Sequence, residues 1–417
     1  MSNRAYLYIY CLLLIAVPFT DLGEAVPNIL IILLSILFPF VVKKSQLYLL
    51  KNRIFISLLL LAILAVLEVL FLSRFEDLRF VSKLFLLLGI YVLSLPVLLK
   101  EHIKKIMYCF LLGVVLLLIA SSYSILSETL YNENFSLAVG DINPVLLGDR
   151  PYVGFTYTIA FFICLFLASK TNNKLESALM VVLSLVLVSF LFLIAARTSL
   201  LSIVLAGILS IFYIKNIKLK LFVLLSIFVS GLSLILFNQN FKSRLTLGFK
   251  QKQLSFEKVI KLEPRYYIWG CVKDIVEDRS PSFFGYGFAA TQEKLNLCYA
   301  NSQEFNNNDQ QSWFVDKKFN THNQYLNFYL STGVLVFLVF SITCFFCLST
   351  NINVFFALAL NVSVLLFFMV ENVLSRQMGV ELCVLVLLFS KAINVLNTEK
   401  ESNRLTKYKI VKDRAVK

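Results

Sequence analysis

Long apolar runs recur along the whole chain and are separated by short polar segments. Twelve of these runs can be marked, at about 5–19, 27–42, 54–73, 80–99, 106–126, 151–169, 177–196, 198–214, 221–237, 324–347, 353–372 and 378–394. A helix of about 20 apolar residues crosses the hydrocarbon core of a bilayer. The pattern therefore predicts an all-α integral membrane protein with about 12 transmembrane helices.

Composition supports this class and excludes others. Of the 417 residues, 59% are hydrophobic and 15% are charged, whereas soluble domains have about 45–50% apolar and about 25% charged residues. A soluble enzyme and a disordered chain are thereby excluded. The net charge of +14 would indicate nucleic-acid binding in a soluble protein. In a polytopic protein, basic residues instead mark the cytoplasmic loops, so no nucleic-acid partner is expected.

The basic residues also predict the orientation. With a cytoplasmic N-terminus, 21 Lys and Arg residues fall in cytoplasmic segments and five fall in the short loops of the other side. Such an excess is typical of the cytoplasmic side. We therefore expect both termini in the cytoplasm, transmembrane helices 1–9 over residues 1–237, a long loop on the opposite side over 238–323, helices 10–12 over 324–394, and a basic tail over 395–417.

His322 is a candidate general base. Thr321 and Gln324 have the spacing of a capping box, which predicts that His322 is the first residue of the tenth span. The positive end of the helix dipole disfavours an imidazolium there, so the neutral ring could accept a proton. The same helix end attracts phosphate. The alternative is an interfacial histidine with no chemical role.

Arginines near the same membrane surface are candidate anion ligands. An amphipathic helix is predicted between Pro264 and Pro281, with Arg265 on its apolar side four residues before Trp269. An arginine there needs an internal carboxylate or a bound anion, unless it snorkels to the surface. Arg197 divides two apolar runs that should form a tight hairpin. If Arg197 lies below the membrane interface, it requires a partner. If it lies at a hairpin tip that water and lipid headgroups reach, it does not.

Three further charged residues are peripheral candidates. Arg150 begins the sixth span and has the same two interpretations as Arg197, and Glu371 and Arg376 share the last outer loop. One histidine with several arginines fits transfer from a diphosphate donor, because guanidinium groups bind phosphate oxygens bidentately and stabilise the departing group. No metal-binding cluster is apparent in the sequence, so neither a metal nor another cofactor is required.

Two pairings are also expected. Glu68 and Lys83 should lie several ångströms below the same surface in antiparallel neighbouring helices, which predicts an ion pair between them. Cys271 and Cys298 are the two cysteines of the long loop, and an oxidising compartment permits a disulfide there. The alternative for Cys271 is packing on the membrane-facing side of its helix.

Three short motifs resemble the O-antigen ligase and polymerase superfamily of bacterial envelope glycosyltransferases. They are Ala195–Ser199 (AARTS), Pro264–Trp269 (PRYYIW) followed by Gly285–Gly287 (GYG), and Thr321–Leu326 (THNQYL). Their order agrees with the arrangement of about twelve spans and one large late loop. The first third of the chain has no matching motif.

The resemblance implies a GT-C-like glycosyltransferase of the bacterial inner membrane that works at the periplasmic face without a metal. It implies an undecaprenyl-diphosphate-linked glycan donor, and it carries the essential histidine onto His322 and the essential arginines onto Arg265 and Arg197. The favoured reaction is transfer of a finished polysaccharide to the lipid A–core of lipopolysaccharide. The alternative is a polymerase with a second lipid-linked repeat unit as acceptor. Intramembrane charges leave a membrane transporter as a third reading.

Overall fold

Every regular element in the part of the chain that this computed structural model describes is helical. The structure describes residues 2–131, 142, 144–217, 220, 264–278, 280–281, 283–302, 305 and 308–415, with the side chains of the last helix described to residue 397. The α-helices are α1 (Ser2–Ala16), α2 (Ala25–Val41), α3 (Lys44–Leu47), α4 (Arg53–Phe71), α5 (Leu78–Leu93), α6 (Lys100–Tyr131), α8 (Arg150–Lys170), α9 (Lys174–Leu193), α10 (Arg197–Ser210), α14 (Pro264–Asp278), α15 (Phe288–Asn301), α16 (Asn308–Lys317), α17 (Gln324–Asn351), α18 (Phe355–Phe368) and α19 (Gln377–Ala415). Short 3₁₀ turns are η1 (Val17–Leu22), η2 (Tyr48–Leu50), η3 (Phe75–Asp77), η4 (Leu95–Val97) and η5 (Val373–Ser375).

The chain is a multi-pass membrane protein. Within the described ranges, eight helices are long and apolar enough to span a bilayer, and the number is nine if α2 and the bent segment after it form one span. Two predicted spans are short helices of 14 residues, α10 and α18. The segment predicted at 221–237 lies outside the described residues. The count of twelve thus stays a prediction.

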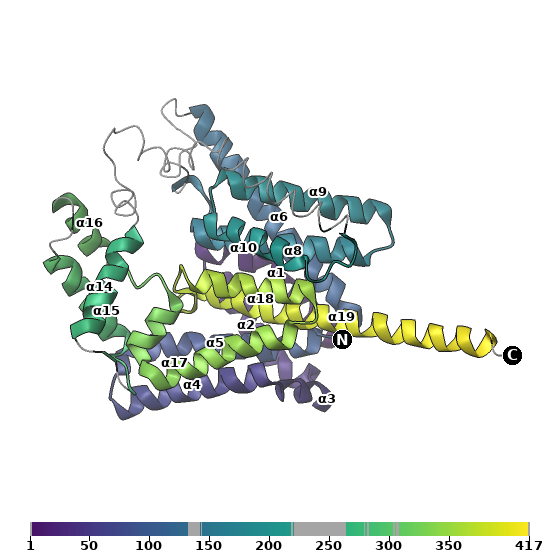
Figure 1. Cartoon of the computed structure of the whole chain (residues 1–417), viewed down its shortest axis with the longest axis horizontal. Coiled ribbons are helices and arrows are strands. Elements are labelled where there is room, and N and C mark those ends of the chain that lie inside the picture. The colour runs from purple at the N-terminus through teal and green to yellow at the C-terminus, as the bar shows by residue number, and fades with distance from the viewer. Residues whose placement is uncertain are drawn as a thin grey trace.

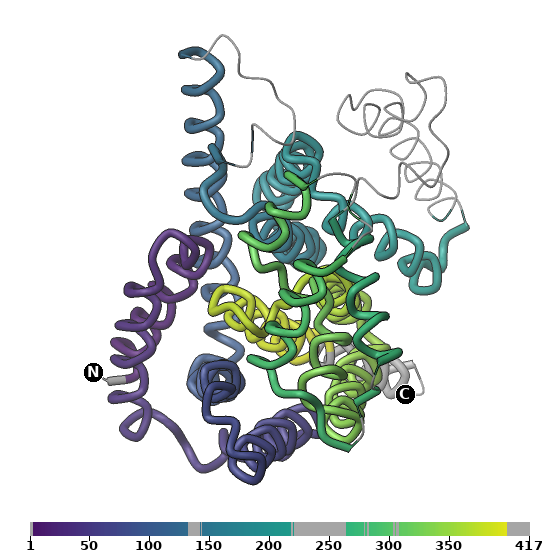
Figure 2. The backbone as a smooth tube through the Cα atoms, turned by 90° about the vertical axis from the view of Figure 1, so that its left-hand side faces the viewer, coloured from purple at the N-terminus to yellow at the C-terminus, as the bar shows by residue number. Residues whose placement is uncertain are grey.

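The helices pack as one bundle with a shared apolar core. The apolar windows of α8 and α19 are 78% and 72% buried, whereas that of α9 is only 22% buried, so the first two are central and α9 is peripheral. Viewed along the bundle, α1 and α2 lie side by side on one edge (Figure 2). The expected basic tail over 395–417 continues α19 as helix to Ala415.

The helices α14, α15 and α16 gather at one end of the bundle, and both chain termini lie toward the other end (Figure 1). The three helices have a small core of their own. Of the apolar face predicted for the first of them, Ile268, Val272 and Ile275 are buried in this core, whereas Trp269 is 39% exposed. The expected disulfide between Cys271 and Cys298 is present and joins α14 to α15.

A kink in α17 holds this group of helices on the bundle. Gly333 has φ +72°, a conformation that glycine adopts without steric cost. The break frees two carbonyl groups of the preceding turn, and these accept hydrogen bonds from the backbone N–H groups of Tyr286 (2.8 Å) and Gly287 (2.8 Å). Gly285 lies so close to α17 that a Cβ there would be 2.3 Å from the carbonyl carbon of Ser331. The GYG motif is therefore a docking segment.

The turn between α4 and α5 also contacts the segment that contains Gly285–Gly287. The ion pair predicted here was wrong. Glu68 does not pair with Lys83: its carboxylate lies 3.5 Å from Arg74 and accepts a hydrogen bond from the N–H of Gly285. The chain reverses at Ser73 with φ +53°, which returns Arg74 over the end of its own helix. Asp77 accepts from the N–H of Ala289 at 2.8 Å and so supplies the N-terminal cap that Gly287 lacks.

Candidate active site

Two helix N-termini open into one pocket at the end of the bundle that carries α14–α16. The turn after α9 reverses through Ala195 at φ +50°, and α10 then begins at Arg197 without a side-chain cap. The tight hairpin predicted at Arg197 is thus confirmed. Nearby, α8 begins at Arg150 and Pro151, also without a side-chain cap. The first N–H groups of a helix have no partner within it, so both ends favour a bound anion.

Three arginines from three helices line this pocket together with one carboxylate. The pocket contains about 500 Å³ of empty space, part of it open to solvent. Its lining consists of Arg150, Pro151, Ala195, Ala196, Arg197, Thr198, Ser199, Arg265, Val370 and Glu371. The lining thus holds three guanidinium groups and one carboxylate, and arginine forks match phosphate oxygens in geometry. The structure thereby brings together four of the candidates that the sequence placed on separate segments.

Arg265 has the internal carboxylate that the sequence left open as one of its possible partners. Its Nη2 donates to Glu371 Oε1 at 3.2 Å and to the carbonyl oxygen of Val370 at 3.1 Å. Its Nε is buried, and no partner for it is found among the residues described. Because Pro264 begins α14, Arg265 lies at the first turn of the helix, against the loop between α18 and α19.

His322 lies on the other side of the same carboxylate. Its Nδ1 is 3.1 Å from Glu371 Oε2, and its side chain is 24% exposed. A carboxylate accepts hydrogen bonds and does not donate them, so Nδ1 carries a hydrogen, and in the neutral ring Nε2 is then the acceptor. Glu371 therefore contacts both the histidine and the arginine of the candidate site through its two oxygens.

The predicted position of His322 at the start of a helix was wrong. Asn323 is the N-cap of α17, since its side chain accepts from the N–H of Leu326, and the helix begins at Gln324. His322 precedes the helix with φ +43°. Thr321 does not cap the helix: its hydroxyl donates to the side-chain oxygen of Asn372 at 2.9 Å and lies 3.0 Å from the carbonyl oxygen of Asn323. The argument from the helix dipole therefore does not apply to the imidazole, and Glu371 orients it instead.

The loop that carries His322 is held by side chains of α14 and α15. Trp269 Nε1 donates to the carbonyl of Thr321 at 3.1 Å, one turn along α14 from Arg265. The hydroxyl of Tyr299 donates to the carbonyl of Phe319 at 3.1 Å, and burial raises the pKa of this phenol well above its ordinary value, which keeps it a donor. The ring of Phe319 in turn packs against the imidazole, with centroids 5.6 Å apart.

The loop between α18 and α19 is hydrogen-bonded to the segment that carries His322. The amide oxygen of Asn372 accepts from Thr321 Oγ1 and from the N–H of Asn323, both at 2.9 Å. The N–H of Leu374 donates to the buried side chain of Gln324 at 2.8 Å. These bonds fix Glu371 between His322 and Arg265, although it is 49 and 106 residues away from them in sequence.

The structure separates two candidates that the sequence placed together: Glu371 lines the pocket and Arg376 does not. Glu371 was only a peripheral candidate and is central in the structure; the sequence signal was a carboxylate beside an apolar run in the same outer loop as Arg376. Arg376 does not line the pocket. It forms an ion pair with Asp149 and lies over the ring of Tyr152 at 5.3 Å, with about half of its side chain exposed.

Comparison with known proteins identifies part of the chain. The family model described as O-antigen ligase matches residues 179–341, from within α9 to within α17. This stretch contains Arg197, Arg265 and His322, while Glu371 lies beyond it. A search of the curated proteins found no match.

Proposed function

Starting from the O-antigen ligase domain of residues 179–341, which ligases and polymerases of lipid-linked glycans share, we propose that this protein transfers a glycan from undecaprenyl diphosphate to the lipid A–core of lipopolysaccharide. The proposal includes the periplasmic location of the pocket and the cytoplasmic location of both termini. The observation that carries it is the meeting of Arg150, Arg197 and Arg265 with the Glu371–His322 pair. A cationic pocket beside an oriented base is what such a transfer needs.

The donor diphosphate occupies the cationic pocket in this mechanism. Arg197 and Arg265 hold its oxygens as forks, and the uncapped N-termini of α10 and α8 add backbone N–H groups and dipole charge. Arg150 adds a third positive charge at the same place. These groups stabilise the negative charge that grows on the diphosphate as its bond to the sugar breaks.

His322 activates the acceptor. Its Nε2 takes the proton of an acceptor hydroxyl while that oxygen attacks the anomeric carbon of the donor sugar. A new glycosidic C–O bond forms, the C–O bond to the diphosphate breaks, and undecaprenyl diphosphate leaves with the bonding electron pair. Glu371 holds the Nδ1–H of the ring and stabilises the imidazolium that results, as a carboxylate does in other oriented-histidine sites.

The test is a rate measurement on the purified full chain with a lipid-linked glycan donor. His322→Gln should lower the transfer rate by about 10²–10⁴-fold, the usual loss for a positioned base, without loss of donor binding. His102→Gln is the matched control, because His102 is the other histidine of the chain and lies beside Glu101 in α6, outside the pocket. Near-normal transfer by His322→Gln would remove the histidine from the chemistry.

A deletion strain then separates ligase from polymerase. Loss of the ligase should leave bare lipid A–core and accumulated lipid-linked polymer. Core capped with single repeat units would instead identify the polymerase. Unchanged surface glycan with altered transport of a solute would contradict glycosyl transfer altogether.

A further inference from the structure

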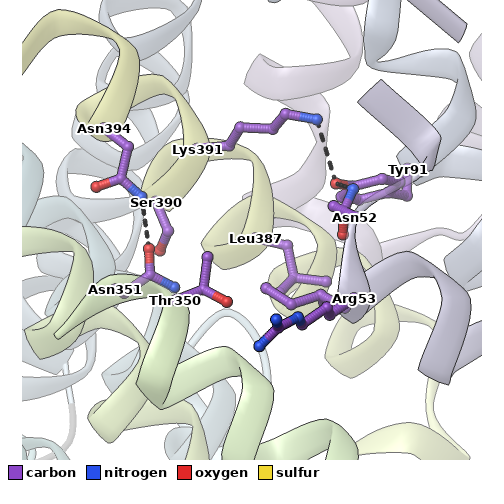
Figure 3. A pocket seen from close by; sticks show the side chains of 10 residues that line it. Asn52, Arg53, Tyr91, Thr350, Asn351, Leu387, Ser390, Lys391 and Asn394 are labelled. Carbon is purple, nitrogen blue, oxygen red and sulfur yellow. Dashed lines mark hydrogen bonds between the residues drawn. The ribbon is translucent and has the colours of Figure 1, made fainter. Parts of the chain in front are cut away.

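A second pocket lies at the opposite end of the bundle from the candidate active site. It is formed by the start of α4, the end of α5, the end of α17 and the middle of α19 (Figure 3). Helix α17 begins beside His322 and runs for 28 residues to Asn351 in this pocket. The helix kinks at Gly333, and the 18 residues from 334 to 351 cover roughly 27 Å at about 1.5 Å per residue, close to the ~30 Å of a bilayer's hydrocarbon core. The two pockets therefore lie at opposite ends of the bundle.

The lining of this second pocket combines two cations with neutral polar groups. It consists of Asn52, Arg53, Ile54, Tyr91, Thr350, Asn351, Leu387, Ser390, Lys391 and Asn394, without an acidic residue. Across the ranges that the structure describes, no ion pair joins Lys391 or Arg53 to a carboxylate. Amides, hydroxyls and unneutralised cations are the groups that bind an anion.

Lys391 is the residue that most needs a counterion. It lies within the span Gln377–Asn397, where a charged side chain is costly and is usually paired. Its Nζ reaches only neutral groups, the carbonyl of Leu49 at 3.3 Å and the hydroxyl of Tyr91 at 3.5 Å, as Figure 3 shows for Tyr91. Asn52 donates to the same hydroxyl at 3.1 Å, which holds the tyrosine in position.

The surroundings of the pocket are suited to acyl chains. Ile54 and Leu387 belong to its lining, and about one and two turns beyond Arg53 along α4 the side chains of Ile56 and Leu60 are exposed, at 55% and 45%. Exposed apolar side chains on a spanning helix face lipid. A molecule whose phosphate enters the pocket can therefore lay its hydrocarbon along α4.

We propose that this pocket binds the phosphate of an anionic phospholipid in the leaflet opposite the candidate active site. Lys391 and Arg53 supply the positive charge, and the neutral amide and hydroxyl groups of the lining surround the phosphate. Basic pockets between transmembrane helices are known to take acidic headgroups. The bound lipid neutralises Lys391 and ties α4, α17 and α19 together at one end. This inference does not rest on the proposed transfer reaction.

Native mass spectrometry of the full-length protein in detergent tests the proposal, with phosphatidylglycerol, phosphatidylcholine and inorganic phosphate as probes. Wild type should bind phosphatidylglycerol at least tenfold more tightly than phosphatidylcholine. The double variant Lys391→Met with Arg53→Gln should lose that preference. Lys51→Met is the matched control and should retain it, because Lys51 lies over the ring of Tyr48 and does not line the pocket.

Two further variants keep the result interpretable. Lys391→Arg retains the charge and should bind phosphatidylglycerol within about threefold of wild type. If the double variant does not fold, Arg53→Gln alone changes an exposed side chain and should weaken binding severalfold. Equal binding of the two lipids by wild type, an unchanged preference in folded variants, or complete displacement of phosphatidylglycerol by equimolar inorganic phosphate would each overturn a lipid site.

Discussion

Glu371 contacts the two residues on which the proposed chemistry depends, with one carboxylate oxygen for each. Oε2 faces the histidine and Oε1 faces Arg265, so the ring orientation and the position of the arginine are set together. Such a residue orients the base without contacting the reacting carbon. A charge at this position matters because it fixes the tautomer and stabilises the protonated ring.

We predict that Glu371→Gln lowers the transfer rate by roughly 10²–10⁴-fold while the protein inserts and folds normally. The amide keeps the size of the side chain, but it provides one acceptor oxygen where the carboxylate provides two. Glu277→Gln is the matched control, since Glu277 is an exposed residue that pairs with Lys273. Steady-state assays compare the transfer rates of the two variants. Full activity of Glu371→Gln would show that Glu371 is not needed to orient His322.

Arg197 and Arg265 are expected to act through their planar forks. Arg197→Lys and Arg265→Lys keep a positive charge but lose bidentate binding, so each should raise the KM for the donor and lower kcat. Arg79→Lys is the control, because Arg79 is exposed outside the pocket. If both lysine variants retain wild-type kinetics with a lipid-diphosphate donor, fork binding is refuted.

At the scale of elements, the docking of Gly285–Gly287 on the kinked α17 controls where α14–α16 lie. We predict that Gly285→Ala abolishes activity and lowers the melting temperature, because the new Cβ would lie 2.4 Å from the backbone N of Thr332. Gly89→Ala is the matched control, with nothing within 4 Å of an added Cβ. Thermal unfolding of both variants in detergent gives the comparison. Equal melting temperatures would mean that the docking contact is not needed.

The disulfide between Cys271 and Cys298 links the helix that carries Arg265 to its neighbour. Replacing both cysteines with serine should cost on the order of 3 kcal/mol in the chain-entropy view of cross-links and should loosen the arginine. Alkylation under denaturing, non-reducing conditions should find these two thiols blocked in wild type. If both react freely, the link is absent from the protein as expressed.

At the scale of the whole molecule, the candidate active site and the second pocket lie at opposite ends of the bundle. The helices α14–α16 and the candidate active site lie at one end, and the termini lie toward the other (Figure 1). The sequence predicts that the termini are cytoplasmic from its excess of lysine and arginine. We therefore expect single cysteines introduced at exposed positions 293 and 317 to react with a membrane-impermeant maleimide added from the periplasmic side, and one introduced at position 2 to remain protected in intact spheroplasts. The opposite labelling pattern would invert the topology and contradict the periplasmic location of the site.

The sequence by itself determined the membrane class, the helical architecture and most helix positions, because the bilayer requires long apolar runs and backbone groups that are satisfied within each helix. It also determined which arginines and which histidine share one end of the bundle, since short loops between spans restrict each charged residue to one surface. The helix at Pro264 and the pairing of Cys271 with Cys298 could be predicted for the same local reasons.

Only the tertiary structure decided how these residues are combined. Glu371 acquires its role from packing between segments that are 49 and 106 residues distant, and no periodicity predicts such a contact. The start of α17 moved because the side chain of Thr321 bonds to Asn372 in another loop, leaving Asn323 as the cap. Glu68 pairs with Arg74 because a left-handed residue at Ser73 turns the chain back. Each outcome depends on competition among long-range partners, which the order of residues along the chain does not encode locally.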